Sequence, residues 1–290
     1  MTIASTLLVG AYQGLAFASA GAQELFPDVT SMGQQLQIIV TYGAPFSFTI
    51  MTILLTHEMG HYLTAHYYRV KATLPFFIPF PFSLIGTLGA FIMIRSPFPH
   101  RRSLIDIGLA GPFAGFIVTI PALFIGIAQS RLGPLVEDGG GLTLGEPILF
   151  RFVSYLLWPE AGDDQVLYIS PVGFAAWFGL LATAINLMPI GQLDGGHASY
   201  ALFRGGAHRI SRIAFFLLFP MAYFGPTWLV WAMLAFLLGI RRPHPPTLAD
   251  YAPLPRSRKW MGALGYLTFV LCFTPEPIVF SWSEVFGGGL

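Results

Sequence analysis

Long apolar segments alternate along this chain with short clusters of cationic residues, and this pattern most constrains how the chain can fold. No lysine or arginine precedes Arg69. Charged residues make up 10% of the chain and hydrophobic residues 54%, whereas a soluble domain carries about 25% charged residues. So few charges cannot cover a water-exposed globule, but a lipid bilayer accepts an apolar surface. We therefore expect an all-α polytopic membrane protein.

The composition also excludes several other classes of protein. A single cysteine rules out a disulfide scaffold. A net charge of +1 provides no basic field for a nucleic acid, so we expect the lipid bilayer, and no nucleic acid, as a partner. The sequence leaves the oligomeric state open.

Seven apolar segments are candidates for membrane-spanning helices. A full span needs about 20 residues, and three segments reach that length: 43–64, 103–128 and 166–188. Four are shorter, namely 3–19, 212–224, 226–240 and 260–275. Gly225-Pro226 splits the pair 212–224 and 226–240, which can be a hairpin or one broken helix. We expect six to seven transmembrane helices, with the basic connecting segments on the cytoplasmic side by the positive-inside rule.

Three regions follow from this reading of the chain. Residues 1–42 are predicted to form an N-terminal span and an external loop, residues 43–204 an intramembrane core, and residues 205–290 C-terminal transmembrane helices. Within the core, the segment 130–165 is expected to be an ordinary exposed connection.

The segment 74–95 interrupts the helical pattern. Pro75, Pro79 and Pro81 make a straight helix unfavourable there. We expect a small membrane-embedded strand or re-entrant region instead. Non-helical backbone at membrane depth must be buried in protein or line a wet cavity.

Residues 57–61, His-Glu-Met-Gly-His, place ionisable groups in an apolar helix. Such groups are energetically costly there, so their presence indicates a specific role. His57 and His61 are four residues apart, so both imidazoles project from one helix face and can bind one ion. Glu58 lies one step round the helix, where it can take a proton from a water molecule at the metal. Zinc suits this ligand set, so we expect Zn²⁺ as the cofactor. The alternative, a structural pair of histidines, would leave Glu58 as a needless buried charge.

A catalytic zinc site needs a third protein ligand, and two aspartates compete for that place. Asp194 follows an outside-to-inside span and two glycines come after it, so it reaches the same face as the histidines. A helix cap on 196–204 is its alternative role. Asp106 also lies near that face, but Ser103 and Asp106 match an S-x-x-D capping box ahead of an apolar run, which explains it without a metal.

Other polar residues have weaker claims on the site. Asn186, near the end of an apolar helix, could stabilise an oxyanion or equally fix a helix contact. His197 is expected to be interfacial rather than a ligand. Surface or packing roles are expected for His66, His100, His208, His244 and Cys272.

At these residues the chain resembles the site-2 protease family of intramembrane zinc metalloproteases, which is of the peptidase M50 type. The resemblance rests on the His57–His61 motif and on Asn186, Pro189 and Asp194-Gly195, which look like the family's N-x-x-P and D-G signature. Residues 109–115, LAGPFAG, are similar to its A-G-P-x-A-G stretch. The likeness covers about 43–204 and implies His57, His61 and Asp194 as zinc ligands.

The resemblance also implies an activity. Glu58 would be the general acid and base that cleaves a membrane-spanning protein substrate near the cytoplasmic face, and residues 86–94 would engage the extended substrate. The connections between spans, at most about 40 residues, are too short for a PDZ domain, and no CBS-type tail is seen, so we expect the short form of the family. The expected location is a bacterial inner membrane.

Three alternatives use the same residues differently. A zinc-binding membrane transporter would keep the ligands without hydrolysis. An aspartyl intramembrane protease would use Asp106 and Asp194 and leave the histidines idle. A multi-span zinc protease that acts on lipidated soluble proteins would take a glutamate as the third ligand.

Overall fold

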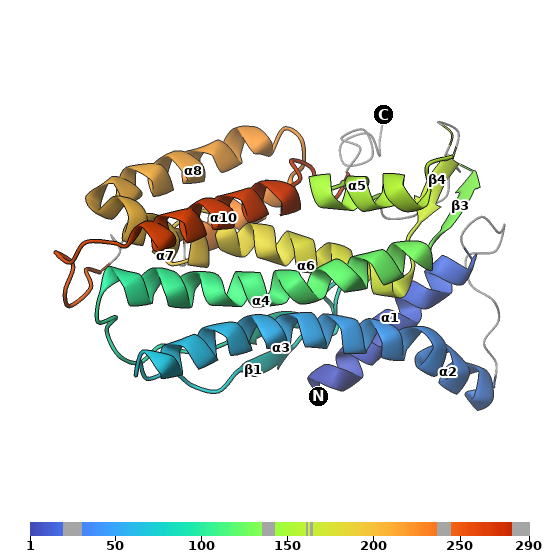
Figure 1. Ribbon diagram of the computed structural model, residues 1–290. Helices are drawn as coiled ribbons and strands as arrows, with labels where there is room; N and C mark the ends of the chain where they lie inside the picture. The colour runs from blue at the N-terminus through green and yellow to red at the C-terminus, as the bar shows by residue number, and fades with distance from the viewer. Residues whose placement is uncertain (20–30, 135–142, 161, 163–164, 237–244, 280–290) are drawn as a thin grey trace.

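The computed structural model describes residues 1–19, 31–134, 143–160, 162, 165–236 and 245–279, and it consists mainly of helices (Figure 1). The helices in the N-terminal half are α1 (Thr2–Ser19), α2 (Met32–Ile38), α3 (Ala44–Tyr67) and α4 (Arg101–Ala128). The later helices are α5 (Ile148–Leu157), α6 (Pro171–Leu187), α7 (Asp194–Phe203), α8 (Ala207–Met221), α9 (Thr227–Ala235) and α10 (Arg256–Cys272). Four short strands accompany them: β1 (Phe76–Pro79), β2 (Thr87–Phe91), β3 (Arg131–Pro134) and β4 (Gln165–Tyr168).

Helix α4 runs between α3 on one side and α6 and α7 on the other (Figure 1). Helix α6 is apolar all round, which is typical of a helix buried on every side, and most of its side chains are buried, including Trp177 and Leu180. It packs against α3, α4 and α10. The centre of the molecule is therefore a bundle of α3, α4 and α6.

Small residues let these three helices approach closely. A Cβ at Gly60 of α3 would collide with the carbonyl oxygen of Ala110 in α4. A Cβ at Gly126 of α4 would collide with the backbone of Gly173 in α6. At these positions the helices pack backbone against backbone, with no long, flexible side chain between them. The bundle is therefore a tightly packed frame for any side chains that project into it.

The segment between α3 and α4 forms a hairpin of strands. β1 and β2 pair in antiparallel register, with Phe76 opposite Phe91 and Phe77 opposite Ala90. Gly86, just before β2, has a φ of +77°, a conformation that glycine adopts without strain. The hydroxyl of Ser5 in α1 donates a hydrogen bond to the carbonyl oxygen of Gly86 at 2.6 Å. The strand or re-entrant region expected near 74–95 is thus a hairpin fastened to α1.

Two helices among the described residues are long and apolar enough to cross a membrane, by length and composition. One is the continuous helical segment 32–67, which joins α2 to α3 through a π-helical turn, and the other is α4. The remaining expected spans correspond to shorter helices, so the number of spans stays a prediction.

Several sequence-based boundaries were wrong. The segment 166–188 begins with strand β4, and its helix starts only at Pro171. The expected exposed connection at 130–165 contains α5, whose Phe150 and Val153 are buried in the main core. Apolar side chains on one face of α5 drive this burial. The pattern is hard to recognise in the sequence, because the segment is short and lies between a glycine-rich and an acidic stretch. Its Gly139-Gly140-Gly141 lies outside the described residues.

Candidate metal centre

His57 and His61 lie on one face of α3, as their spacing predicts. Both side chains are buried, and their Nε2 atoms are 3.2 Å apart. Two ring nitrogens this close, with no proton to share if both are neutral acceptors, favour a cation between or beside them. The i, i+4 spacing in a straight helix therefore produces the convergence that metal binding needs.

Asp194 completes this group from a distant part of the chain. Its Oδ2 atom lies 3.4 Å from His57 Nε2 and 3.3 Å from His61 Nε2. Helix α7 begins at Asp194, with Leu193 in the cap position and no side-chain capping bond. The alternative role of Asp194 as a helix cap is therefore wrong, because its carboxylate points at the histidines instead.

The three donor atoms suit a zinc ion. They lie within 4.8 Å of one another, and the group is the one cluster of its kind in the described parts of the chain. His61 Nδ1 lies 2.7 Å from the carbonyl oxygen of Ile107. A carbonyl only accepts, so Nδ1 carries the ring proton and Nε2 keeps its lone pair for a metal. Two imidazoles and one carboxylate leave a tetrahedral ion one open position.

Glu58 lies beside the group but does not belong to it. It is half-buried on the neighbouring helix face, and its carboxylate lies near the backbone of Ile92. Ile92 follows β2 directly. The hairpin therefore passes close to this carboxylate, beside the metal-ligating atoms.

Asn186, near the end of α6, also reaches the group. Its Nδ2 atom is 3.4 Å from His57 Nε2. This places an amide donor at the rim of the site, where it can either orient His57 or face a bound molecule. The two uses expected from the sequence both remain compatible with this position.

Glycines of α4 make room for the histidine rings. A Cβ at Gly111 would overlap the imidazole of His61, and one at Gly115 would come within 3.1 Å of His57 Cβ. A Cβ at Gly108 would lie 3.1 Å from His197 Cβ. The sequence analysis noted residues 109–115 only as part of a family resemblance. Their spacing of small residues every three or four positions is the signal that could have identified α4 as the wall of the site.

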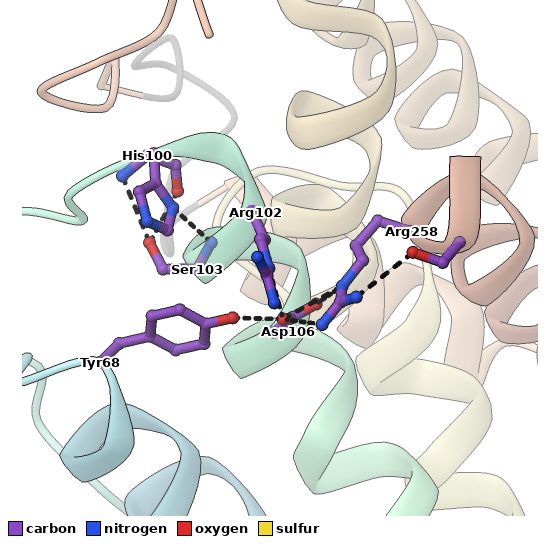
Figure 2. Close-up of polar contacts among 7 residues, drawn as sticks. Tyr68, His100, Arg102, Ser103, Asp106 and Arg258 are labelled. Carbon is purple, nitrogen blue, oxygen red and sulfur yellow. Dashed lines mark hydrogen bonds and ion pairs between the residues drawn. The ribbon is translucent and has the colours of Figure 1, made fainter. Parts of the chain in front are cut away.

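Asp106 has a different environment, which corrects two expectations. It accepts hydrogen bonds from Tyr68 Oη at 2.5 Å and from Arg258 Nη2 at 2.9 Å, and Arg102 Nε lies 3.8 Å away (Figure 2). We call Tyr68, Arg102, Asp106 and Arg258 the Asp106 cluster. Asp106 is thus absent from the metal-ligating group, and its carboxylate is occupied by donors.

The capping box was also misplaced. Helix α4 begins at Arg101, with His100 as the N-cap and Ser103 as its reciprocal partner (Figure 2). The S-x-x-D pattern is therefore not the cap, because the helix starts two residues earlier than the apolar run suggests. His100, expected to be solvated, is a half-buried capping residue whose ring also contacts Tyr68.

The other histidines that the structure describes, and the cysteine, lie outside the metal-ligating group. His197 is half-buried against Phe98, with the ring centroids 5.7 Å apart. His66 is exposed at the end of α3, and Cys272 is fully buried in the core. The expectation for His244 falls outside the described residues.

The chain is similar to known proteins of one family. The model of peptidase family M50 matches residues 45–221. The chain is 30% identical over 272 residues to the probable zinc metalloprotease EGY1, chloroplastic, of Oryza sativa subsp. japonica, which covers 91% of this chain and 46% of the relative. It is 31% identical over 251 residues to the Arabidopsis thaliana protein of the same name, with 85% and 44% covered.

A third relative, the probable zinc metalloprotease EGY2, chloroplastic, of Arabidopsis thaliana, is 29% identical over 269 residues, with 91% of this chain and 47% of the relative covered. The chain thus spans about half the length of the curated relatives it matches. No solved structure matches the chain. The matched family segment includes α3, α4, α6 and α7 and hence every residue of the metal-ligating group.

Proposed function

The chain belongs to peptidase family M50, and from that premise we propose that it is a zinc metalloprotease that hydrolyses a peptide bond of a membrane-spanning substrate. One observation carries the proposal: His57, His61 and Asp194 direct metal-ligating atoms at one point, and Glu58 stands beside them. The names of the EGY relatives, which describe probable zinc metalloproteases, support the same activity. We assign the protease core to residues 43–204.

Each residue of the site has a role in this reaction. A zinc ion held by the two histidines and the aspartate would polarise the scissile carbonyl and make water nucleophilic near neutral pH. Glu58 accepts a proton from the attacking water and passes it to the leaving amine. Asn186 donates from Nδ2 to the developing oxyanion. The Ile107 carbonyl keeps the His61 proton on Nδ1, away from the reacting groups.

The β1–β2 hairpin provides the binding edge for the substrate in this proposal. Each strand pairs on one side only, so an outer edge offers backbone groups to an extended chain. Ile92, directly after β2, lies near Glu58, so a chain added to the edge would lie next to the site. A helical substrate must unwind to present its carbonyl, and residues that weaken helices should favour cleavage.

Exposed apolar side chains on the helices support the proposed membrane location. On α10, Trp260, Leu264, Leu267 and Val270 are exposed apolar side chains on one face, as for a helix that contacts lipid. We propose a multi-pass protein with six to seven spans whose basic end faces the cytoplasm, as in a bacterial inner membrane.

The position of the site along α4 agrees with such a location. Gly111, which contacts His61, lies ten residues after Arg101, the first residue of α4. Ten helical residues correspond to about 15 Å. The site lies inside the helical bundle, nearer its basic end, and this depth supports the proposal that water enters from the cytoplasmic side.

The decisive experiment replaces Glu58 with an amide of the same shape. In Glu58→Gln, purified in detergent, we expect bound zinc to be retained, because Glu58 is not a ligand, while cleavage of a membrane-spanning substrate falls by about 10²- to 10⁴-fold. Glu146→Gln is the matched control, since Glu146 pairs with Arg151 at the surface. Zinc flux into liposomes that persists in Glu58→Gln, with no cleavage by the wild type, would support a transporter and overturn the proposal.

A further inference from the structure

The first turn of α7, which carries Asp194, has little intrinsic stability. Its cap residue, Leu193, provides no side-chain hydrogen bond, and two glycines follow Asp194 directly. Glycine is among the poorest helix formers, and a missing N-cap costs further stability. This turn must nevertheless hold a carboxylate in place beside two imidazoles, so its geometry has to be fixed by contacts from outside the helix.

The glycines supply part of that support by allowing close packing. A Cβ at Gly195 would collide with the carbonyl oxygen of Leu187, at the end of α6, and one at Gly196 with that of Gly191. The turn is thereby seated on the preceding backbone. This contact restricts its position from one side only.

A partly buried pair of hydroxyl groups also supports the turn. The Ser199 hydroxyl donates to the carbonyl oxygen of Gly195 at 2.7 Å, and the Tyr266 hydroxyl lies 2.7 Å from the same Ser199 oxygen. A serine has one hydroxyl proton. Because Ser199 gives that proton to Gly195, Tyr266 must be the donor to Ser199. The chain of bonds therefore runs from Tyr266 in α10 to the residue next to Asp194.

Helix α10 is docked closely enough to make this contact specific. A Cβ at Gly265, adjacent to Tyr266, would come within 3.0 Å of Leu109 in α4, and one at Gly262 would lie 2.7 Å from Leu202 in α7. Two turns earlier, Arg258 binds Asp106. The helix is thus fixed at its basic end and at the level of Tyr266, although it lies beyond the segment 45–221 that the family model matches.

We propose that Tyr266 is a positioning residue for the metal centre, which acts through Ser199 and Gly195 to hold Asp194 at its ligating position. The inference rests on the proposed function, because it assigns the C-terminal helix a part in that same site. Loss of the tyrosine hydroxyl frees the first turn of α7 and lets the carboxylate move. Metal affinity then falls, although no ligand has been removed.

The test compares Tyr266→Phe with Ser199→Ala and with the double variant in the full chain. We expect each single variant to weaken zinc binding by about tenfold, the range seen when an outer hydrogen-bond partner of a ligand is lost. Zinc affinity is measured by competition with a chromophoric chelator. The double variant should lose no more than either single variant, because all three break the same chain of bonds. Tyr155→Phe, at an exposed position on α5, is the matched control.

A second readout separates positioning from stability. The visible absorption of the Co²⁺-loaded protein reports on ligand geometry, and we expect it to change in Tyr266→Phe and Ser199→Ala but not in Tyr155→Phe. Unchanged zinc affinity and an unchanged Co²⁺ spectrum in both hydroxyl variants would overturn the inference alone. A wild type that binds neither ion would overturn the proposed function together with it.

Discussion

Two aspartates lie near the same end of the bundle, and their surroundings differ completely. Asp106 faces a phenol and two guanidinium groups, all of which donate or carry positive charge. Asp194 faces the Nε2 atoms of two imidazoles, one of which has its ring proton directed elsewhere. The first carboxylate faces guanidinium groups that always carry a positive charge, whereas the second faces imidazoles that can also bind a metal ion.

This difference shows how one residue type acquires two functions. A buried carboxylate needs a partner of opposite charge. Where arginine supplies that charge, the result is a structural link between helices, here α3, α4 and α10. Where imidazoles face the carboxylate, a cation bound by the ring nitrogens can supply the opposite charge. The identity of the neighbours, rather than the aspartate, decides the function.

The largest expected effect comes from removing each aspartate in turn. Loss of a hydrogen-bond partner of a metal ligand weakens binding by about 10- to 100-fold. Asp194→Ala removes a ligand itself, so zinc binding should weaken by more than that, and cleavage should be lost. Asp106→Ala should change zinc affinity far less than Asp194→Ala, because Asp106 is not a ligand, and should lower the free energy of unfolding by about 1–3 kcal/mol, since partly buried donors lose their charged partner. Zinc titration and detergent-based unfolding measure the two quantities.

The reverse pattern would reject the comparison. If Asp106→Ala released zinc while Asp194→Ala kept it, the third ligand would be assigned to the wrong helix. The paired variants are well matched, because both remove a carboxylate from a helix in the same end of the bundle.

A smaller effect is expected at the wall of the metal centre. Gly111→Ala should gain about 1 kcal/mol of helix propensity, but its Cβ meets the buried ring of His61. Overpacking of this kind costs about 1–3 kcal/mol, and the ring cannot yield without leaving the Ile107 carbonyl. We therefore expect a net loss of stability and weaker zinc binding.

Gly205→Ala is the control for that substitution, because a Cβ there meets nothing within 4 Å. It should change neither the free energy of unfolding by more than about 0.5 kcal/mol nor the affinity for zinc. Equal behaviour of the two variants, measured by thermal unfolding and zinc titration, would show that α4 does not constrain His61.

Much of the fold could be predicted from the sequence, because its longest helices are defined by local signals. The segments 43–64 and 103–128 correspond to α3 and α4, and prolines correctly excluded a straight helix before β2. Errors fell where tertiary contacts decide. Helix α5 depends on packing against the core, and the start of α4 depends on His100, whose capping by a ring nitrogen is not among the common sequence patterns.

The candidate site divides in the same way. The convergence of His57 and His61 follows from helix geometry alone. The sequence favoured Asp194 over Asp106, but it explained Asp106 by a capping box that the structure does not contain. The actual partner of Asp106 is Arg258, which lies 152 residues away along the chain. Tyr266 was not anticipated for the same reason: a tyrosine in an apolar helix carries no local sign of the serine it contacts.

The smallest expected effect concerns Tyr68, at the edge of the Asp106 cluster. Burial and the hydrogen bond to the Asp106 carboxylate both favour the protonated phenol and raise the pKa of Tyr68 above its ordinary value. The native state thus holds this proton more tightly than the unfolded chain. Its contribution to stability is complete below about pH 10, the ordinary pKa of tyrosine, and is lost as the pH rises through the native-state pKa.

Tyr68→Phe removes that contribution. At neutral pH we expect a loss of about 1 kcal/mol in the free energy of unfolding, for one hydrogen bond, with zinc affinity unchanged. Above pH 10 the wild type should lose stability more steeply than the variant, so the two curves converge. Parallel curves would mean that Tyr68 does not donate to Asp106. Convergence would show that the aspartate is held by the protein's own donors, which is the property that separates Asp106 from Asp194.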